Sequence, residues 1–240
     1  LKRVPSVTFL SDVLESDGVR LRGLDPAYTQ ILINGEKVPG AGSDSGAFGN
    51  GADGAFFVDR IPAELIERVE VVRSASANRS GDAVAGALNI VLRDGYSLDG
   101  GYLRAGGIML DDERVKGTVG GVYSGQVGPG RLLVGANIQG RRNPKLKQSF
   151  RYDEPGGTLD DIELQTDTRD GTDYSLNGSF EIPVFGGEFS IDGLYVHTDR
   201  TANEDSLEYE NGVIDDTRLL SINDNDVDTE QDSYSINSRY

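Results

Sequence analysis

The 240-residue sequence contains no cysteine and no tryptophan, and it has a single histidine, His197. Without cysteine the chain can form neither disulfides nor thiolate metal sites. One histidine excludes poly-histidine metal sites and leaves one candidate base for a Ser-His-Asp triad. No apolar run approaches the ~18 residues of a transmembrane helix. No signal peptide opens the chain, and it starts at Leu1 rather than Met, so we interpret it as a mature or cut fragment. We expect neither an enzyme nor a bound cofactor.

Basic residues are also scarce. The net charge is −17, which argues against nucleic acid as a partner. The imbalance is concentrated in residues 201–232. This stretch contains eleven acidic residues and one basic residue, Arg218, and so has a net charge of −10. This stretch shows no obvious strand pattern, so we expect a solvated loop.

The first part of the chain, to about residue 94, mixes short elements. Residues 8–18 could form an amphipathic helix, and residues 29–40 read as a hairpin around Asn34-Gly35, the strongest short turn signal. The segment 61–77, IPAELIERVEVVRSASA, starts like a helix and continues as a valine-rich strand. We therefore expect a small α+β domain over residues 1–94.

From about Tyr96 the hydrophobic period becomes two, and we expect six strands of about ten residues or more. In one of them Tyr174, Leu176 and Phe180 alternate with Ser175, Asn177 and Ser179. The connections 127–130 and 183–188 are short and are expected at one end of the strands. The connections 110–114, 143–172 and 201–232 are expected at the opposite end, and the last two are expected to be long polar loops. Short turns at one end, long loops at the other and one apolar face are typical of a transmembrane β-barrel.

Six antiparallel strands cannot close such a barrel, because single-chain bacterial barrels begin at about eight. The expected fold is thus a small α+β domain at 1–94 followed by a partial transmembrane β-barrel at 95–240. A soluble β-sandwich with one polar face is the alternative.

Three motifs in the first domain resemble the plug domain of TonB-dependent outer-membrane receptors. They are VRLRGLDPAYTQILINGEKVPG (19–40), DRIPAELIERVEVVRSASA (59–77) and GDAVAGALNIVLRDG (81–95), and LKRVPSV (1–7) is similar to a further family segment. The resemblance covers residues 1–95 almost continuously, in the family's order and spacing.

The resemblance implies a plug that fills a barrel of about 22 strands in the outer membrane of a Gram-negative bacterium. It implies energised uptake of a scarce ligand, an iron chelate, cobalamin or carbohydrate. It also implies two partners: a periplasmic TonB-type energy-coupling protein, whose binding peptide is expected upstream of Leu1, and outer-membrane lipid. Most of the barrel would lie downstream of Tyr240.

Two sets of plug residues are candidates for function. The loop GNGADG (49–54) matches a dinucleotide-binding pattern literally, but no strand precedes it and no helix opens at it. The family resemblance instead implies a loop that faces incoming ligand, with candidates Asp44, Phe48, Asn50, Asp53 and Phe56. On the strand 68–73, charged residues could contact the barrel wall; these are Arg68, Glu70 and Arg73.

The acidic stretch 201–232 suggests two further properties. Asp224, Asp226 and Asp228 occupy alternate positions as at the start of a calcium loop, but Thr229 replaces the required glycine. They remain weak candidates for loose binding of Ca²⁺ or Mg²⁺. An acidic rim would also disfavour a strongly anionic ligand.

Two other function classes are compatible with parts of this pattern. A β-rich, calcium-associated surface adhesion module would explain the strands and the acids but has no use for plug motifs. A passive porin would explain the barrel but lacks a plug.

Overall fold

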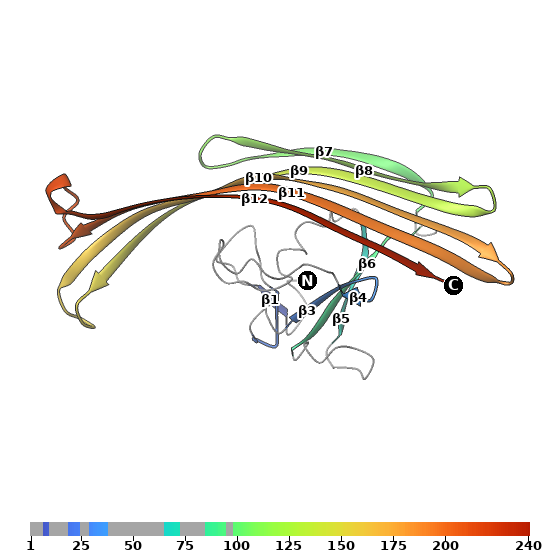
Figure 1. Ribbon diagram of the computed structural model, residues 1–240, viewed down its shortest axis with the longest axis horizontal. Coiled ribbons are helices and arrows are strands. Elements are labelled where there is room, and N and C mark those ends of the chain that lie inside the picture. The colour runs from blue at the N-terminus through green and yellow to red at the C-terminus, as the bar shows by residue number, and fades with distance from the viewer. Residues whose placement is uncertain (1–6, 10–18, 25–28, 38–64, 73–84, 95–97) are drawn as a thin grey trace.

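The computed structural model describes residues 7–9, 19–24, 29–37, 65–72, 85–94 and 98–240. Within these ranges the chain forms two short-stranded sheets near its N-terminus and one large antiparallel sheet, arranged as in Figure 1. The small sheets contain β1 (Val7–Phe9), β2 (Val19–Leu21), β3 (Thr29–Ile33), β4 (Glu36–Lys37), β5 (Ile66–Val72) and β6 (Gly86–Leu92). The large sheet contains β7 (Gly100–Met109), β8 (Val115–Val127), β9 (Gly130–Tyr152), β10 (Leu159–Val184), β11 (Gly187–Glu210) and β12 (Leu219–Arg239).

The expected hairpin at Asn34-Gly35 is confirmed. Both residues have positive φ, 50° and 88°, which a type I′ turn requires. The Asn34 side chain accepts a hydrogen bond from the Leu92 amide at 2.9 Å, and the Gly35 amide donates to Asn89 Oδ1 at 2.7 Å. The turn thereby fastens the hairpin to β6, beside which β3 runs in parallel.

The valine-rich strand after residue 65 is also confirmed. β5 pairs with β6, and Val69 and Val71 pack against the buried core of the small domain. The helical part of the expected α+β plug falls largely outside the described residues, and Val7–Phe9, at the start of the expected helix 8–18, forms a strand instead. Among the described residues no helix is long and apolar enough to cross a membrane.

The large sheet contains the six expected strands in sequential antiparallel order, β7 to β12. The partial β-barrel fold is confirmed. In β10 the polar residues Asp173, Ser175 and Asn177 are buried, while the intervening Tyr174 and Leu176 are exposed. The sheet is curved, and its concave side covers the small domain (Figure 1). The buried polar residues of β10 lie on this concave side and the exposed Tyr174 and Leu176 on the convex side. We call these the inner and outer faces of the wall.

The prediction of long loops at 143–172 and 201–232 is wrong. β10 has 26 residues and β11 has 24, so both stretches continue the strands well past the small domain. Within these two stretches only 153–158 and 211–218 form turns. The connection 110–114 turns at the same end, and the opposite end turns at 128–129 and 185–186. At about 3.3 Å per residue, β10 is roughly 86 Å long.

Cross-strand partners explain why an acidic stretch forms a strand. Polar donors on β11 stand opposite carboxylates on β12: Thr201 donates to Asp228 at 2.8 Å, and Asn203 donates to Asp226. At the end of the extension Arg151 pairs with Glu208 at 2.6 Å and with Asp161 at 2.8 Å. Charge composition along one segment does not report these neighbours, because they come from other strands.

Candidate functional site at the plug–wall interface

The hydrophobic core of the small domain includes two residues of the wall. Leu194 and Val196 of β11 point inward and belong to the same buried cluster as Leu65, Ile90 and Leu92. Val196 is fully buried and Leu194 is 6% exposed. The small domain and the sheet therefore share one core.

A glycine on the inner face lets the two parts approach closely. A Cβ atom on Gly135 of β9 would lie 2.6 Å from a methyl carbon of Leu65 and 2.3 Å from Asn177 Oδ1. Only a residue without a side chain fits this position unless Leu65 moves. The carbonyl of Leu65 is itself held by the Arg93 amide at 2.8 Å.

Small polar side chains line the wall around this contact. Ser175, Asn177 and Ser179 of β10 are buried. A small cavity lies between Asn177, Ser179 and the Asn34 turn, bordered by Arg93, Asp192 and Asn237. The Asn177 Oδ1 atom has no protein hydrogen-bond partner. A shared interface of this kind combines a small apolar contact with polar groups that water can satisfy.

Farther along the strands the inner face carries a buried ionic cluster. Asp173 is 3% exposed and pairs with Arg141 of β9 and with Arg200 of β11, the latter at 3.4 Å. Thr198 donates to the other carboxylate oxygen of Asp173 at 2.9 Å. Three neighbouring strands are thereby cross-linked on the side that faces the small domain.

The candidates on β5 contact one another. The Arg68 guanidinium pairs with Glu67 at 3.0 Å and with Glu70 at 2.9 Å, and Asn89 donates to the second oxygen of Glu70 at 2.9 Å. These contacts lie within the small domain, and Arg68 remains exposed. A role of both residues in contact with the wall stays a prediction.

The third candidate of this set, Arg73, lies outside the described residues. So does the whole expected ligand-facing set, namely Asp44, Phe48, Asn50, Asp53 and Phe56.

Asp224, Asp226 and Asp228 share the outer face of β12, where all three are exposed. Successive outward residues of a strand diverge rather than converge on one point. Among the described residues no group of three His, Asp or Glu side chains is gathered to hold a metal ion.

The outward position of these acids also removes the argument that an acidic rim disfavours anionic ligands. The inner face opposite them carries bases as well as acids: Lys147 donates to Gln165 at 3.2 Å, and Arg169 pairs with Asp167 at 3.4 Å. Sequence reasoning missed these inner residues because it treated 143–172 as a loop. The alternation in QTDTRD (165–170) is the signal that could have found them.

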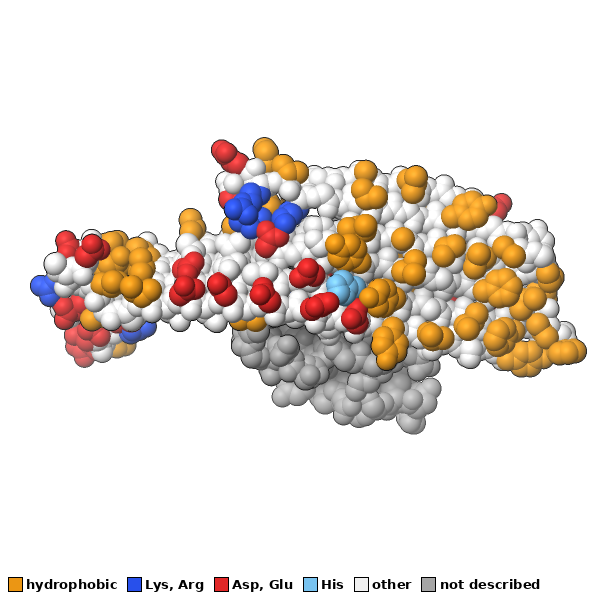
Figure 2. Space-filling model, turned by 45° about the horizontal axis from the view of Figure 1, so that its top comes forward, with side chains coloured by type: hydrophobic (Ala, Val, Ile, Leu, Met, Phe, Trp, Pro, Cys, Tyr) orange, Lys and Arg blue, Asp and Glu red, His pale blue; other side chains and the backbone are white. Residues whose placement is uncertain are grey.

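The outer face is apolar over the half of the sheet that covers the small domain. Figure 2 shows this concentration of hydrophobic side chains, and the single histidine lies at its boundary with a row of acids. His197 bonds Asp232 at 2.9 Å and lies beside the Tyr174 ring, with 5.8 Å between the ring centroids. We call the exposed hydrophobic set the outer apolar belt; it consists of Tyr123, Val134, Tyr174, Leu176, Ile191, Tyr195, Tyr234 and Ile236.

The large sheet has an apolar belt on its outer face and a polar inner face, and it shares a core with the small domain. This is the arrangement expected of a barrel wall around a plug. The family model of the TonB-dependent receptor plug domain matches residues 1–87. Residues 1–87 therefore belong to the plug-domain family of the TonB-dependent receptors, and the chain resembles these receptors. Its location is the one these receptors share, the outer membrane of a Gram-negative bacterium.

Curated relatives of the receptor include two classes of transporter. The chain is 35% identical over 78 residues to the ferrienterobactin receptor of Escherichia coli K12, covering 32% of this chain and 10% of that protein. It is 26% identical over 200 residues to the vitamin B12 transporter BtuB of Photobacterium profundum, covering 81% of this chain and 30% of the relative. The chain thus spans less than a third of these relatives.

Two solved structures also match the chain in part. The siderophore receptor PirA of Acinetobacter baumannii superposes with a TM-score of 0.49 at 16% identity, covering 86% of this chain and 40% of that one. The ferric enterobactin receptor of Pseudomonas aeruginosa superposes with a TM-score of 0.47 at 14% identity.

Proposed function

We propose that the whole protein takes up a scarce ligand across the outer membrane, with energy supplied by a periplasmic TonB-type coupling protein. The ligand classes are those of the sequence prediction: an iron chelate, cobalamin or carbohydrate. Residues 1–94 act as the plug and residues 95–240 as the first part of the barrel wall.

One observation carries this proposal: the plug and the wall share a core on the concave face of a sheet whose convex face is apolar. A passive porin has no such plug. An adhesion module does not account for a second domain that packs against a polar inner face. The names of the curated relatives favour the iron-chelate and cobalamin classes over carbohydrate.

The proposed orientation follows from the same arrangement. The turns at 128–129 and 185–186 face the periplasm, and the long strand extensions of β9–β12 project from the cell. The inner face of these extensions would then line the entrance for the ligand. Its mixed charge, with Lys147, Arg169 and Glu204 among its residues, is compatible with anionic and with neutral ligands.

The test is uptake by cells that differ only in this gene. A deletion strain and a complemented strain are supplied with radiolabelled ferric enterobactin or radiolabelled cyanocobalamin, with and without a protonophore. We expect gene-dependent uptake of one compound that the protonophore abolishes.

Gene-dependent uptake that continues in the presence of the protonophore would indicate a porin and contradict the proposal. Uptake of neither compound and of no oligosaccharide, together with a cell-adhesion defect in the deletion strain, would favour the adhesion module.

A further inference from the structure

The strand extensions carry a second apolar surface on the outer face. We call it the distal apolar patch, and it consists of Leu146, Phe150, Leu164, Leu207 and Ile222. The register joins these residues across four strands: Phe150 stands opposite Ile162, which is buried, and Leu164, Leu207 and Ile222 stand side by side. Leu146 is 88% exposed, Ile222 68% and Phe150 53%.

This patch is separate from the outer apolar belt. Along β11, Leu207 in the patch lies twelve positions after Tyr195 in the belt, a distance of about 40 Å at 3.3 Å per residue. The apolar band of an outer-membrane barrel is only about 25 Å tall. The hydrocarbon core of one bilayer therefore cannot cover both surfaces.

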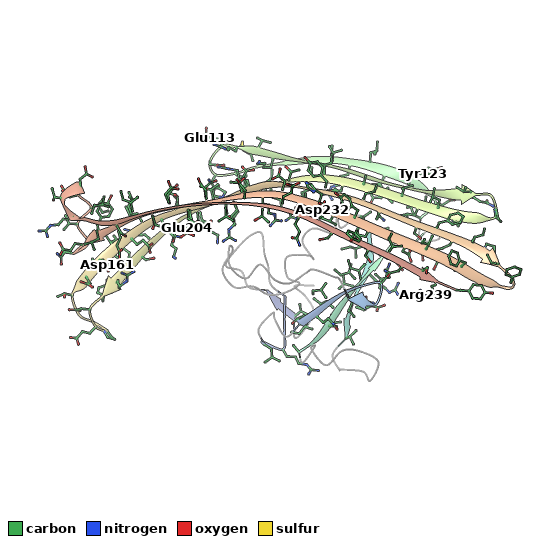
Figure 3. The ribbon with its side chains drawn as sticks, in the orientation of Figure 1. Glu113, Tyr123, Asp161, Glu204, Asp232 and Arg239 are labelled. Atoms are coloured by element: carbon green, nitrogen blue, oxygen red, sulfur yellow. The ribbon has the colours of Figure 1, made fainter. Side chains whose placement is uncertain are left out.

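On β11 and β12 acidic residues occupy the space between them, whereas on the neighbouring strands Arg142 and Lys116 pair with the outward-facing Asp170. The outer acidic band consists of Asp199, Asp205, Asp224, Asp226, Asp228, Glu230 and Asp232, all exposed. No Lys or Arg occupies an outward position in 199–207 or 222–232. Figure 2 shows the row of acids leading to the hydrophobic cluster near the tip, and Figure 3 marks Asp232 near the start of the row.

Two cross-strand pairs within the band are of like charge. Asp199 stands opposite Glu230, and Asp205 stands opposite Asp224. Like charges directly opposite each other destabilise a sheet, whereas a positively charged partner would relieve the repulsion. A further strand paired with the free edge of β12 would not supply this partner. It would form hydrogen bonds with the β12 backbone and leave the outer face of the sheet uncovered.

We propose that the distal apolar patch and the outer acidic band together form a docking surface for a separate cell-surface protein with an apolar centre and a basic rim. Apolar patches of a few hundred Å² mark such interfaces. A second copy of this chain fits less well, because it would bring one acidic band against another. This role goes beyond ligand uptake and does not depend on which ligand is carried.

The test uses a photo-crosslinking amino acid in the full-length receptor in intact cells. We expect an adduct with one cell-surface protein when the probe replaces Ile222 or Leu146, and none when it replaces Val227, which points inward on the same strand. Mass spectrometry of the adduct should locate the crosslink in an apolar segment flanked by Lys or Arg.

A second variant isolates the charges. The triple substitution Asp224→Asn, Asp226→Asn, Asp228→Asn removes the repulsion between Asp205 and Asp224 and keeps a side-chain oxygen that can accept from Thr201 and Asn203. The receptor should therefore fold normally and keep its heat-modifiable mobility on gels. We expect the yield of adduct, and the affinity of the purified partner for the purified receptor, to fall at least tenfold. Glu204→Gln, an acid on the inner face, is the matched control and should change neither.

Four results would overturn the proposal: an adduct between two receptors, an adduct with lipid alone, no adduct at either position, or binding unchanged by the triple substitution. Each can occur with ligand uptake intact, so the outcome is distinct from that of the transport experiment.

Discussion

At the scale of single residues, one missing side chain permits the contact between plug and wall. Gly135 lies on the inner face of β9, where the Leu65 side chain of the plug occupies the space that a Cβ atom would need. Gly178 of the wall has no such role, because the nearest atom to a Cβ there would be the Leu133 carbonyl oxygen at 3.7 Å. Gly178 occupies an outward-facing position of β10.

Substitution of these two glycines should therefore have different effects. Gly135→Val should displace Leu65 and weaken plug packing by about 1–3 kcal/mol, the usual cost of overpacking. We expect faster protease cleavage of the plug in the purified full-length receptor. Gly178→Val is the control and should leave the cleavage rate unchanged; equal rates for both variants would show that Gly135 is not a contact point.

At the scale of elements, charged pairs hold the β7–β8 turn against the neighbouring strands. Asp112 in this turn pairs with Arg142 of β9 at 2.6 Å, and Arg142 also pairs with Asp170 of β10 at 2.6 Å. The hydrogen bond from Arg142 is the main cause that lowers the pKa of Asp112 below its usual 3.8. A carboxylate with a lowered pKa stabilises the folded state above its ordinary pKa, and this contribution is lost as the pH falls through the lower value.

The turn should thus loosen only in acid. We expect hydrogen exchange of the amides in 110–114, corrected for intrinsic rates, to be constant from neutral pH to about 4 and to accelerate between about pH 4 and 2. Asp112→Asn should show the faster exchange already at neutral pH and lose the acid-dependent step. If wild-type exchange began to accelerate near neutrality, the Asp112–Arg142 pair would not be its cause.

At the scale of the whole molecule, one sheet passes through two environments. Leu176 of β10 belongs to the outer apolar belt and is 52% exposed, whereas Thr168 of the same strand faces outward beside the acidic band. Eight residues separate them, about 26 Å along the strand. The same substitution at the two positions therefore compares lipid with water.

An arginine should distinguish the two environments. Leu176→Arg should reduce the free energy of unfolding by about 2–4 kcal/mol if it lies near the middle of the bilayer, and Thr168→Arg by about 0–1 kcal/mol. The measurement is equilibrium unfolding of the full-length receptor in lipid vesicles. Similar losses for both variants would show that the belt does not lie in the bilayer.

The sequence by itself determined the elements whose signals are local. Asn34-Gly35 needs only its own φ values to form a hairpin, and the alternation around Tyr174 assigns each side chain of a strand to one of two faces. The family motifs identified the plug for the same reason, since they are continuous in the chain.

Only the tertiary structure decided what lies opposite each residue. It turned the acidic segment 201–232 from an expected loop into paired strands, directed Asp224, Asp226 and Asp228 outward, and placed Leu194 and Val196 in the core of the plug. A carboxylate is stable in a strand when a donor such as Thr201 or Asn203 faces it, and those donors lie more than twenty residues away along the chain. Composition sums charge along the chain, whereas electrostatic energy depends on distance in space.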